Sequence, residues 1–550
     1  MRDAVGSAIA ASTPCSQAVP ECTTCSEFLL FFLRALNKAA RSAFPAIESA
    51  LHPLARVAMR GANYPKLTAC VACVAVLSMG GVIFGIAGLY PALYIRGFWE
   101  GMCETAMCDL RGEMNRAASV PYERLSRFST TLLQVFTEMP PGVVPEACCS
   151  AQVLTVGVVT SVAFALTDGS SAVWGELNDR LGPKWGISVA VGLVVFSQLL
   201  LVVASSSALR INDQLATAAF FGIGAGGAGV TTAAFVGCTL AVASASATMQ
   251  AYLSTGLAAT FDISAIVFPL VSELHQMGIA LPIIVGLIWL PISAIAGGWL
   301  IWLFSEPAPP PKQADVAPKE GSALLDGEKA PAASQEPSPK CMEKGGQAST
   351  LLSAHNLLLL AFMCAFTMAT TFHVSVYGLE SRLRFGEGKA AKFENVFSIG
   401  FPLSSLLAAL FCIPLLRYTT DRPHIYWACA VGVSCIWAIF TLIPVEAAQY
   451  FAAVFFGVAR TAVWSAYYHF LSSPAYYPPE MIGRVLGCNT LVVAFMGDLL
   501  SHLVERVAVR TPAEVPPIIG CRVWLLLQLL LAAAFPLFLW RSWYQSNVAR

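Results

Sequence analysis

The sequence alternates long apolar runs with short polar segments. Most runs hold about 20 residues or more, the length that an α-helix needs to cross a hydrocarbon core of about 30 Å. A helix satisfies its own backbone N–H and C=O groups, as a lipid environment requires. The pattern therefore predicts an all-α polytopic membrane protein. Its twelve predicted transmembrane spans are residues 67–94, 151–174, 186–206, 213–237, 247–272, 278–304, 352–377, 394–416, 424–444, 447–471, 484–506 and 516–540.

Residues 306–350 interrupt this pattern. They are rich in Pro, Ala, Ser, Lys and Glu and lack apolar periodicity, which predicts a disordered cytosolic linker. The linker divides the spans into six and six, and six-helix repeats that face each other across a central site are a transporter architecture. Within the N-terminal arm, residues 27–57 fit either an interfacial amphipathic helix or a cytosolic helix. The predicted organisation is an arm at 1–66, six-helix halves at 67–305 and 351–550, and the linker between them.

Charged residues make up 12% of the chain, whereas a soluble domain carries about 25%. The formal net charge is zero, so no nucleic-acid partner is expected. Arg and Lys gather in the arm and in segments 175–185 and 417–423, which the positive-inside rule places in the cytosol with both termini. Residues 379–393 are expected in an outer loop, and their Arg and Lys mildly oppose the rule. The outer loop 95–150 can form disulfides, whose pairing the sequence leaves open.

A charged segment, G-E-L-N-D-R-L-G-P-K, joins the second and third spans and is predicted to be a turn. The corresponding segment of the second half also contains Asp-Arg, a weak internal repeat. An aspartate there can face the N-terminus of a neighbouring helix, glycines allow close approach, and arginine binds carboxylate or phosphate. We interpret these residues as a conformational latch, whereas the alternative is a solvated turn. The latch candidates are Gly175, Asp179, Arg180, Gly182, Lys184, Asp421 and Arg422.

The segment Gly175–Lys184 matches G-x-x-x-D-R-x-G-x-[RK] and so resembles the signature motif of the major facilitator superfamily. Gly81–Leu89 resembles the first helix of that superfamily's large neutral amino acid transporters. Ser264–Pro269 resembles their fifth helix, and Gly457–Arg460 their tenth. The long first outer loop and the central linker are similar to those of the apicomplexan amino acid transporters, a branch of the same group. The resemblance implies a twelve-helix carrier of amino acids, although Arg417-Tyr418 replaces the glycine region expected in the second half.

Ionisable side chains inside predicted spans are costly and tend to face a cavity or a partner. Asp262 lies near mid-depth of the fifth span, with Thr255 on nearly the same face. Arg460 lies near mid-depth of the tenth span, Asp168 in the second and Asp498 in the eleventh. One interpretation pairs Asp262 with Arg460 as a buried ion pair between the halves. The other assigns Arg460 to a substrate carboxylate, and Asp262 or Asp168 to its amine or a cationic side chain.

Further candidates lie in the seventh and first spans. His373 and Tyr377 share a face, and His373 is either a proton carrier, because imidazole titrates near neutral pH, or a hydrogen-bonded packing residue. Gly81 and Gly85 permit either close helix packing or local unwinding, and unwound backbone can bind ammonium or carboxylate groups. Gly222–Gly227 formally fits G-x-G-x-x-G, but it lies inside an apolar span. No nucleotide, other cofactor or metal is therefore expected.

The sequence predicts a secondary carrier, not an enzyme, that moves an amino acid across a membrane by alternating access. The intramembrane aspartates outnumber the central arginine, which favours a cationic amino acid such as arginine or lysine, with large neutral amino acids next. The alternatives are a carrier for another small solute and a non-transporting nutrient receptor of the same fold. The expected partners are the solute and a lipid bilayer, and the expected location is the plasma membrane. The identity of the amino acid, the coupling ion and the oligomeric state are left open.

Overall fold

The computed structural model describes residues 64–95, 97–99, 150–206, 211–241, 247–305, 351–473, 476–478, 481–508 and 515–548. All of them lie in one compact unit, Val57–Arg550, and none of them forms a β-strand. The predicted interfacial helix at 27–57, the linker at 306–350 and nearly all of the outer loop lie outside the described residues. We call residues 64–305 the first half and residues 351–548 the second half.

The first half is built from helices, several of which are interrupted inside a predicted span. Its elements are α2 (Pro65–Met79), the 3-10 helix η2 (Val82–Leu89), α3 (Tyr90–Ile95), α6 (Ser150–Gly169), α7 (Ser171–Leu181), α8 (Pro183–Ser206), α9 (Asn212–Ala241), α10 (Ala247–Ile263), the 3-10 turn η5 (Ser264–Ile266), α11 (Val267–Gln276), α12 (Leu281–Ile283), the π-helical η6 (Ile284–Trp289) and α13 (Leu290–Leu303).

The second half has longer uninterrupted helices at its start and a π-helical segment near its end. Its elements are α15 (Ala354–Phe385), α16 (Glu387–Tyr418), α17 (Pro423–Leu442), α18 (Glu446–Leu471), α19 (Ile482–Val493), the π-helical η8 (Ala494–Leu499), α20 (Leu500–Ala508), α21 (Val515–Leu531) and α22 (Ala534–Val548).

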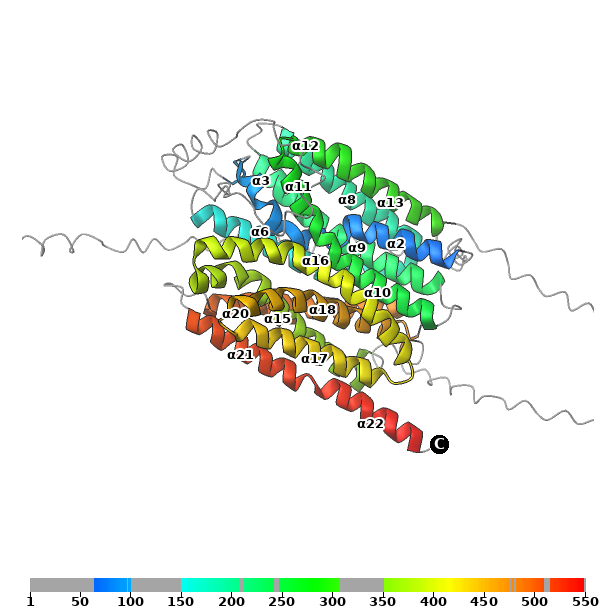
Figure 1. The fold of residues 1–550 in the computed structure, drawn as a ribbon. Coiled ribbons are helices and arrows are strands. Elements are labelled where there is room, and N and C mark those ends of the chain that lie inside the picture. The colour runs from blue at the N-terminus through cyan, green and yellow to red at the C-terminus, as the bar shows by residue number, and fades with distance from the viewer. Residues whose placement is uncertain are drawn as a thin grey trace, which may run out of the picture. The chain divides into compact units, whose positions relative to one another are not determined.

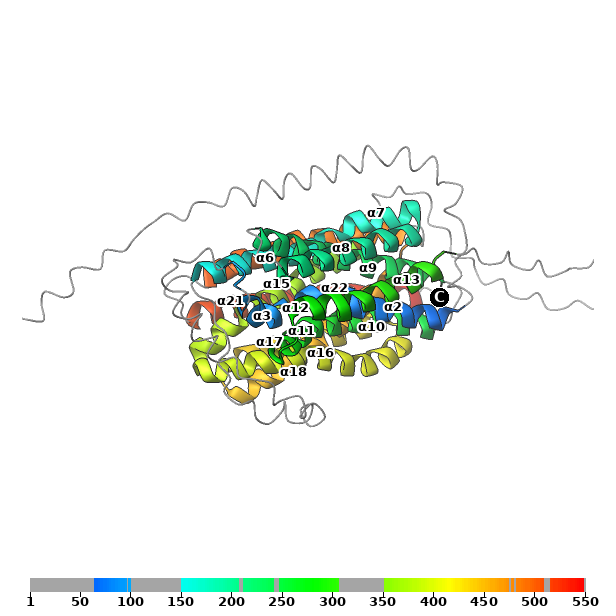
Figure 2. The ribbon, with the colours of Figure 1, turned by 90° about the horizontal axis from the view of Figure 1, so that it is seen from above.

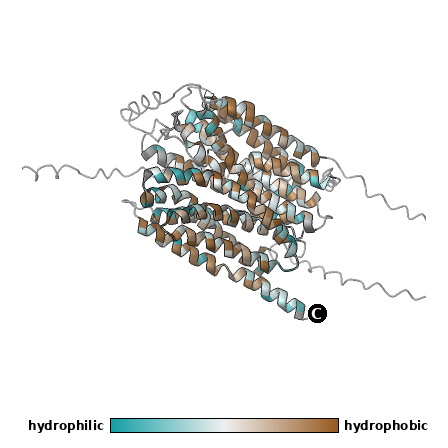
Figure 3. Cartoon of the chain, viewed as in Figure 1, coloured by the Kyte–Doolittle hydropathy of each residue, from teal (hydrophilic) through white to brown (hydrophobic). Residues whose placement is uncertain are grey.

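Among the described residues, ten helical runs are long and apolar enough to cross a membrane, judged by length and composition. The other two predicted spans, 447–471 and 484–506, coincide with α18 and with the run α19–η8–α20. Apolar residues extend along most helices, whereas the C-terminal end of α22 is polar (Figure 3). Large apolar side chains such as Leu287, Phe411 and Leu531 are 74%, 74% and 77% exposed. Outward-facing side chains of this kind are what a lipid-facing surface requires.

The two halves pack side by side along several helices (Figures 1 and 2). Helix α10 of the first half lies against α16 and α18 of the second half. Helix α7 packs on α19, and α6 packs on both α19 and η8. Helix α9 also contacts α19, so the interface between the halves is formed mainly by the second, fourth and fifth predicted spans on one side and the eighth, tenth and eleventh on the other.

The first predicted span is not one continuous α-helix. Helix α2 ends at Met79, and the chain continues as the 3-10 helix η2 after Gly80 and Gly81. At Gly85 a Cβ atom would collide with the backbone carbonyl of Ala265 in η5. The backbones of the first and fifth spans thus touch directly, which only glycine permits at this position.

Two segments predicted as loops are largely helical. Residues 175–181 belong to α7, where Glu176 and Arg180 form an i,i+4 ion pair that supports helical structure. The turn itself is confined to Gly182, whose φ of 83° favours glycine. The segment 379–393, predicted to lie outside, is also helical except at Gly386. Helix α15 continues to Phe385 and α16 begins at Glu387, so only Gly386 connects them.

Candidate functional site

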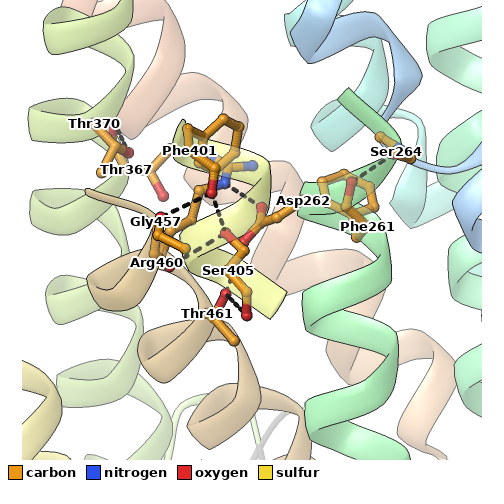
Figure 4. Close-up of polar contacts among 12 residues, drawn as sticks. Phe261, Asp262, Ser264, Thr367, Thr370, Phe401, Ser405, Gly457, Arg460 and Thr461 are labelled. Atoms are coloured by element: carbon orange, nitrogen blue, oxygen red, sulfur yellow. Dashed lines mark hydrogen bonds and ion pairs between the residues drawn. The ribbon is translucent and has the colours of Figure 1, made fainter. Parts of the chain in front are cut away.

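A buried ion pair joins the halves at the centre of the interface. The Nε atom of Arg460 in α18 donates to Oδ1 of Asp262 in α10 at 2.5 Å, and both side chains are buried (Figure 4). The hydroxyl of Thr461 donates to the other carboxylate oxygen at 3.3 Å. The guanidinium carbon lies 4.6 Å from the ring centroid of Phe84, a cation–π distance. Arg460 is therefore held by Asp262 and an aromatic face, the arrangement of the ion-pair interpretation.

A small cavity, with about 30 Å³ of space for the centres of water-sized spheres, lies at the same interface. Both halves contribute to its wall, because α6, α7, α9 and α10 line it together with α18 and α19. The wall is mixed, with hydroxyl groups, aromatic rings and one carboxyl group. Residues that carry these groups include Asp168, Thr231 and Thr232 from the first half and Trp464, Tyr468 and Thr490 from the second.

The one carboxyl among the cavity-lining residues, that of Asp168, lies beside a second carboxyl from the other half. The side chains of Asp168 in α6 and Asp498 in η8 are neighbours where α6 packs on η8. Thr371 of α15 donates its hydroxyl to Oδ1 of Asp498 at 2.7 Å. Asp498 is 3% exposed and is not among the residues that line the cavity. The sequence places both acids inside spans, but only the tertiary structure brings them together.

His373 and Tyr377 lie away from the cavity, in the packing of the second half. His373 is fully buried, its Nδ1 lies 3.0 Å from Nη1 of Arg522, and its ring packs on that of Tyr377. Arg522 in α21 also donates from Nε to Glu380 at 2.8 Å, and Arg384 pairs with the same carboxylate. This arrangement matches the packing interpretation of His373. The sequence analysis missed Arg522, although it stands alone in a long apolar run.

Thr255, Gly81 and Gly85 are not among the residues that line the cavity. Thr255 is fully buried in α10. The backbone N–H of Gly81 donates to Oγ of Ser264 at 2.8 Å, across the contact between the first and fifth spans. The two glycines therefore serve close helix packing, together with the local change from α-helix to 3-10 helix at Val82.

At one end of the interface, α7 meets the N-terminus of α19. The carboxylate of Asp179 accepts the backbone N–H groups of Gly483 at 3.1 Å and Arg484 at 2.8 Å. These N–H groups belong to the first turn of α19, where they have no partner within the helix and where the helix dipole favours an anion. A Cβ atom at Gly175 would collide with the carbonyl of Gly483. The aspartate thus takes the position on a neighbouring helix that the latch interpretation expects.

Two charged residues missing from the predicted set complete this contact. Glu176 pairs with Arg180 of its own helix and with Arg484 of α19, whose Nε lies 2.8 Å from the carboxylate. Nε of Arg484 also lies 3.9 Å from Asp179. The available signal was Arg484, a basic residue that follows Gly483 at the start of the eleventh span and could have been matched with Asp179.

For Arg422 and Lys184, the ring contacts found among the described residues stay within their own half. Asp421 is exposed and has no ion-pair partner in the described part of the chain. Arg422 precedes α17 and its guanidinium lies 5.6 Å from the ring of Trp543, within the second half. Lys184 lies 5.9 Å from the ring of Trp185, its neighbour in sequence. The two Asp-Arg copies therefore differ in their surroundings, because only the first lies against a helix of the other half.

No group of three or more His, Cys, Asp or Glu side chains is placed to hold a metal ion within the described residues. The site consists of the cavity, the Arg460–Asp262 ion pair and the Asp168–Asp498 pair. Its chemistry is that of charge and hydrogen-bond recognition between two packed halves.

Comparisons with known proteins place this arrangement in a family. The model of the Major Facilitator Superfamily matches residues 129–501. The structure is similar to that of the human organic anion transporter MFSD10 (TETRAN), with 12% identity, a TM-score of 0.55, and coverage of 86% of this chain and 99% of that one. A second similar structure is the fucose:proton symporter of E. coli, with 13% identity, a TM-score of 0.46, and coverage of 83% and 99%.

The structure is also similar to that of a bacterial homologue of the iron transporter ferroportin in an outward-facing state, with 13% identity, a TM-score of 0.46, and coverage of 83% of this chain and 99% of that one. At these identities the structural likeness concerns the fold alone. A search of curated proteins found no significant match. Because the family match extends over more than half of the sequence, this chain belongs to the Major Facilitator Superfamily and has its all-α, membrane-spanning fold.

Proposed function

We propose that this chain is a secondary carrier that moves an amino acid across a membrane by alternating access. The observation that carries the proposal is the cavity, which both halves line and which has a carboxyl group in its wall. Carriers of this architecture bind solute between their halves and expose the site to each side in turn. The cavity and the interface contacts therefore lie between the two halves, where a carrier of this architecture binds its solute.

The charges around the cavity favour a solute with an ammonium or guanidinium group. The positive charge of Arg460 is offset by Asp262, to which it is hydrogen bonded. Asp168 and Asp498 have no basic residue as a hydrogen-bond partner among the described side chains, so the pair leaves negative charge beside the cavity. A cationic solute can offset that charge, whereas an anionic one adds to it. We therefore propose arginine or lysine before large neutral amino acids.

The contact of Asp179 with α19 supports the proposed cycle. It closes one end of the interface through two hydrogen bonds and the ion pair of Glu176 with Arg484. A small set of polar contacts can break in the opposite access state and re-form, which fits a latch. We propose that this end faces the cytosol, that both termini lie there, and that the protein resides in the plasma membrane. Labelling of terminal tags in intact and permeabilised cells tests the orientation.

Uptake of radiolabelled solutes by proteoliposomes containing the purified protein tests the function. The panel contains arginine, lysine, leucine, tyrosine, fucose and an organic anion. The proposal expects arginine or lysine to enter faster than the other solutes, and Asp168→Asn to reduce that uptake. Gly192→Ala is the matched control, because a Cβ atom there meets nothing within 4 Å. Preference for fucose or the organic anion contradicts the proposed substrate class. Binding of arginine without any flux supports the receptor alternative instead.

A further inference from the structure

The second half contains a buried cluster of charges with one cation in excess. The guanidinium groups of Arg384 and Arg522 both pair with the carboxylate of Glu380, and the three charged side chains are 4% to 5% exposed. Nδ1 of His373 lies 3.0 Å from Nη1 of Arg522 and must accept its proton, so this histidine is neutral. Two positive charges and one negative charge remain. A buried charge without a counter-charge is costly.

The other acids near the cluster are more exposed and already have cationic partners. Glu394 of α16 pairs with Arg382 at 3.4 Å, and their side chains are 38% and 51% exposed. Glu446 at the start of α18 pairs with Lys389, and both side chains are about half exposed. Helices α17 and α21, which pack on each other beside the cluster, contain neither Asp nor Glu. The described part of the chain therefore offers no buried carboxylate that offsets the excess charge.

The cluster also has more hydrogen-bond donors than acceptors. Because Nδ1 of His373 accepts a hydrogen bond, the proton of the ring lies on Nε2, which is buried without an acceptor among the described residues. Nε1 of Trp437 and Nε of Arg384 are buried donors in the same condition. The rings of His373 and Trp437 pack edge to face, with centroids 5.4 Å apart. Unpaired buried donors are costly, and an anion can accept from several donors at once.

A small cavity lies beside these groups, within the second half. Its wall includes Arg522 of α21 together with Trp437 and Thr441 of α17, and is otherwise formed by alanine and leucine side chains. Nη1 of Arg384 donates to the backbone carbonyl of Thr441 at 3.2 Å, which brings the second guanidinium to the same end of α17. The cavity has about 10 Å³ of space for the centres of water-sized spheres. That space suits one occupant of about the size of a water molecule.

We propose that this cavity binds one monatomic anion, chloride. The anion cancels the excess positive charge beside Arg522 and accepts from donors that otherwise have no partner, and it holds α15, α17 and α21 together. A water molecule can accept the same hydrogen bonds but cannot offset the charge, and phosphate or a lipid headgroup is too large for the space. None of the residues that line this cavity also lines the interface cavity. The site therefore does not depend on the proposed function.

Thermal unfolding of the purified protein in detergent tests the site without any transported solute. Sodium gluconate is replaced stepwise by sodium chloride at constant ionic strength, so that the general screening of charges stays the same. A ligand that binds only the folded state stabilises it further with each tenfold rise in concentration above Kd. The melting temperature should therefore increase with chloride in this way. Equal melting temperatures in chloride and gluconate overturn the site.

Two variants and a control locate the effect. Arg522→Met leaves Glu380 paired with Arg384 in a neutral cluster, so the dependence on chloride should vanish. Trp437→Phe keeps an aromatic ring but removes one N–H, so about tenfold more chloride should be needed for the same stabilisation. This second variant decides the matter if Arg522→Met does not fold. Trp299→Phe is the control, because Trp299 lies in the first half and is 61% exposed.

The remaining outcomes separate the anion from its alternatives. A chloride effect of equal size in Trp437→Phe and Trp299→Phe overturns the proposed place of the anion. Stabilisation by phosphatidylglycerol in gluconate that is lost in Arg522→Met, with no effect of chloride, overturns the monatomic anion and assigns the cluster to a lipid headgroup. Because melting temperature is measured without transport, a protein that carries no amino acid but binds chloride as expected contradicts only the proposed function.

Discussion

The Nε atom of Arg460 lies 2.5 Å from Oδ1 of Asp262, so a cation from the second half and an anion from the first neutralise each other inside the protein. The side chains are 9% and 1% exposed, and each would be costly to bury alone. The pair therefore acts as a fixed electrostatic contact between α18 and α10. The pair also limits the ability of Arg460 to bind solute, because an arginine bound to aspartate must give up that partner before it can hold a solute carboxylate.

Removing one member of this pair should destabilise the protein strongly. Asp262→Leu leaves the guanidinium of Arg460 buried without a counter-charge, which typically costs about 3–5 kcal/mol. The double variant Asp262→Leu with Arg460→Met replaces both charges by apolar groups and should recover most of that loss. Thermal unfolding of the purified protein in detergent, arranged as a double-mutant cycle, measures both effects. Additive losses in the double variant would show that the two side chains do not depend on each other.

Asp179→Asn should slow transport without changing which solute is preferred. The variant keeps one oxygen acceptor for the first turn of α19 but loses the negative charge that faces the helix dipole and Arg484. Such a charge at a helix N-terminus contributes about 0.3–1 kcal/mol at an exposed site and up to about 2 kcal/mol when partly buried. We expect a severalfold lower kcat in the uptake assay.

The second copy of the motif provides the control for Asp179. Asp421 is exposed and has no ion-pair partner among the described residues, so Asp421→Asn should leave kcat and solute ranking unchanged. A changed solute ranking in Asp179→Asn would place that residue at the site itself. Equal losses in the two variants would instead support a symmetrical latch.

Gly175→Ala should push the ends of α7 and α19 apart. The added methyl group collides with the carbonyl oxygen of Gly483, a backbone atom that cannot rotate away. The access state with this contact closed becomes less favourable, so the cavity should be more open at this end. Labelling of a cysteine introduced at Thr490, which lines the cavity, measures the change. Gly192→Ala, which adds the same methyl group in open space, should leave the labelling rate as it is.

Glu380→Gln should destabilise the second half because it removes the anion between Arg384 and Arg522. Both ion pairs are about 5% exposed, so two guanidinium groups would remain buried near each other. The expected loss is about 3–5 kcal/mol, seen as a lower melting temperature. Glu446→Gln removes an exposed pair with Lys389 and should cost at most about 1 kcal/mol. Similar melting temperatures for the two variants would contradict this assignment.

The sequence alone determined most of the fold, because membrane crossing leaves a strong local signal. A run of apolar residues long enough to span the bilayer must be helical, whatever surrounds it. The runs predicted from 67–94 to 516–540 accordingly coincide with described helices. Local sequence was a poorer guide to where helices end. Residues 175–181 and 379–385 are polar, and the i,i+4 pairs Glu176–Arg180 and Glu380–Arg384 lie within helices that continue past the apolar run.

The tertiary structure decided which candidate residues share a site. Asp262 and Arg460 meet, Asp168 and Asp498 meet, and His373 instead joins Arg522 in the packing of the second half. These residues are far apart in sequence, and hydropathy shows only that each lies in a span, not which way it points or which helix it faces. Contacts between helices depend on how the two halves pack, and that arrangement has no local signal in the chain. The sequence therefore indicates how deep in the membrane a residue lies, whereas only the tertiary structure shows which residue it contacts across the interface.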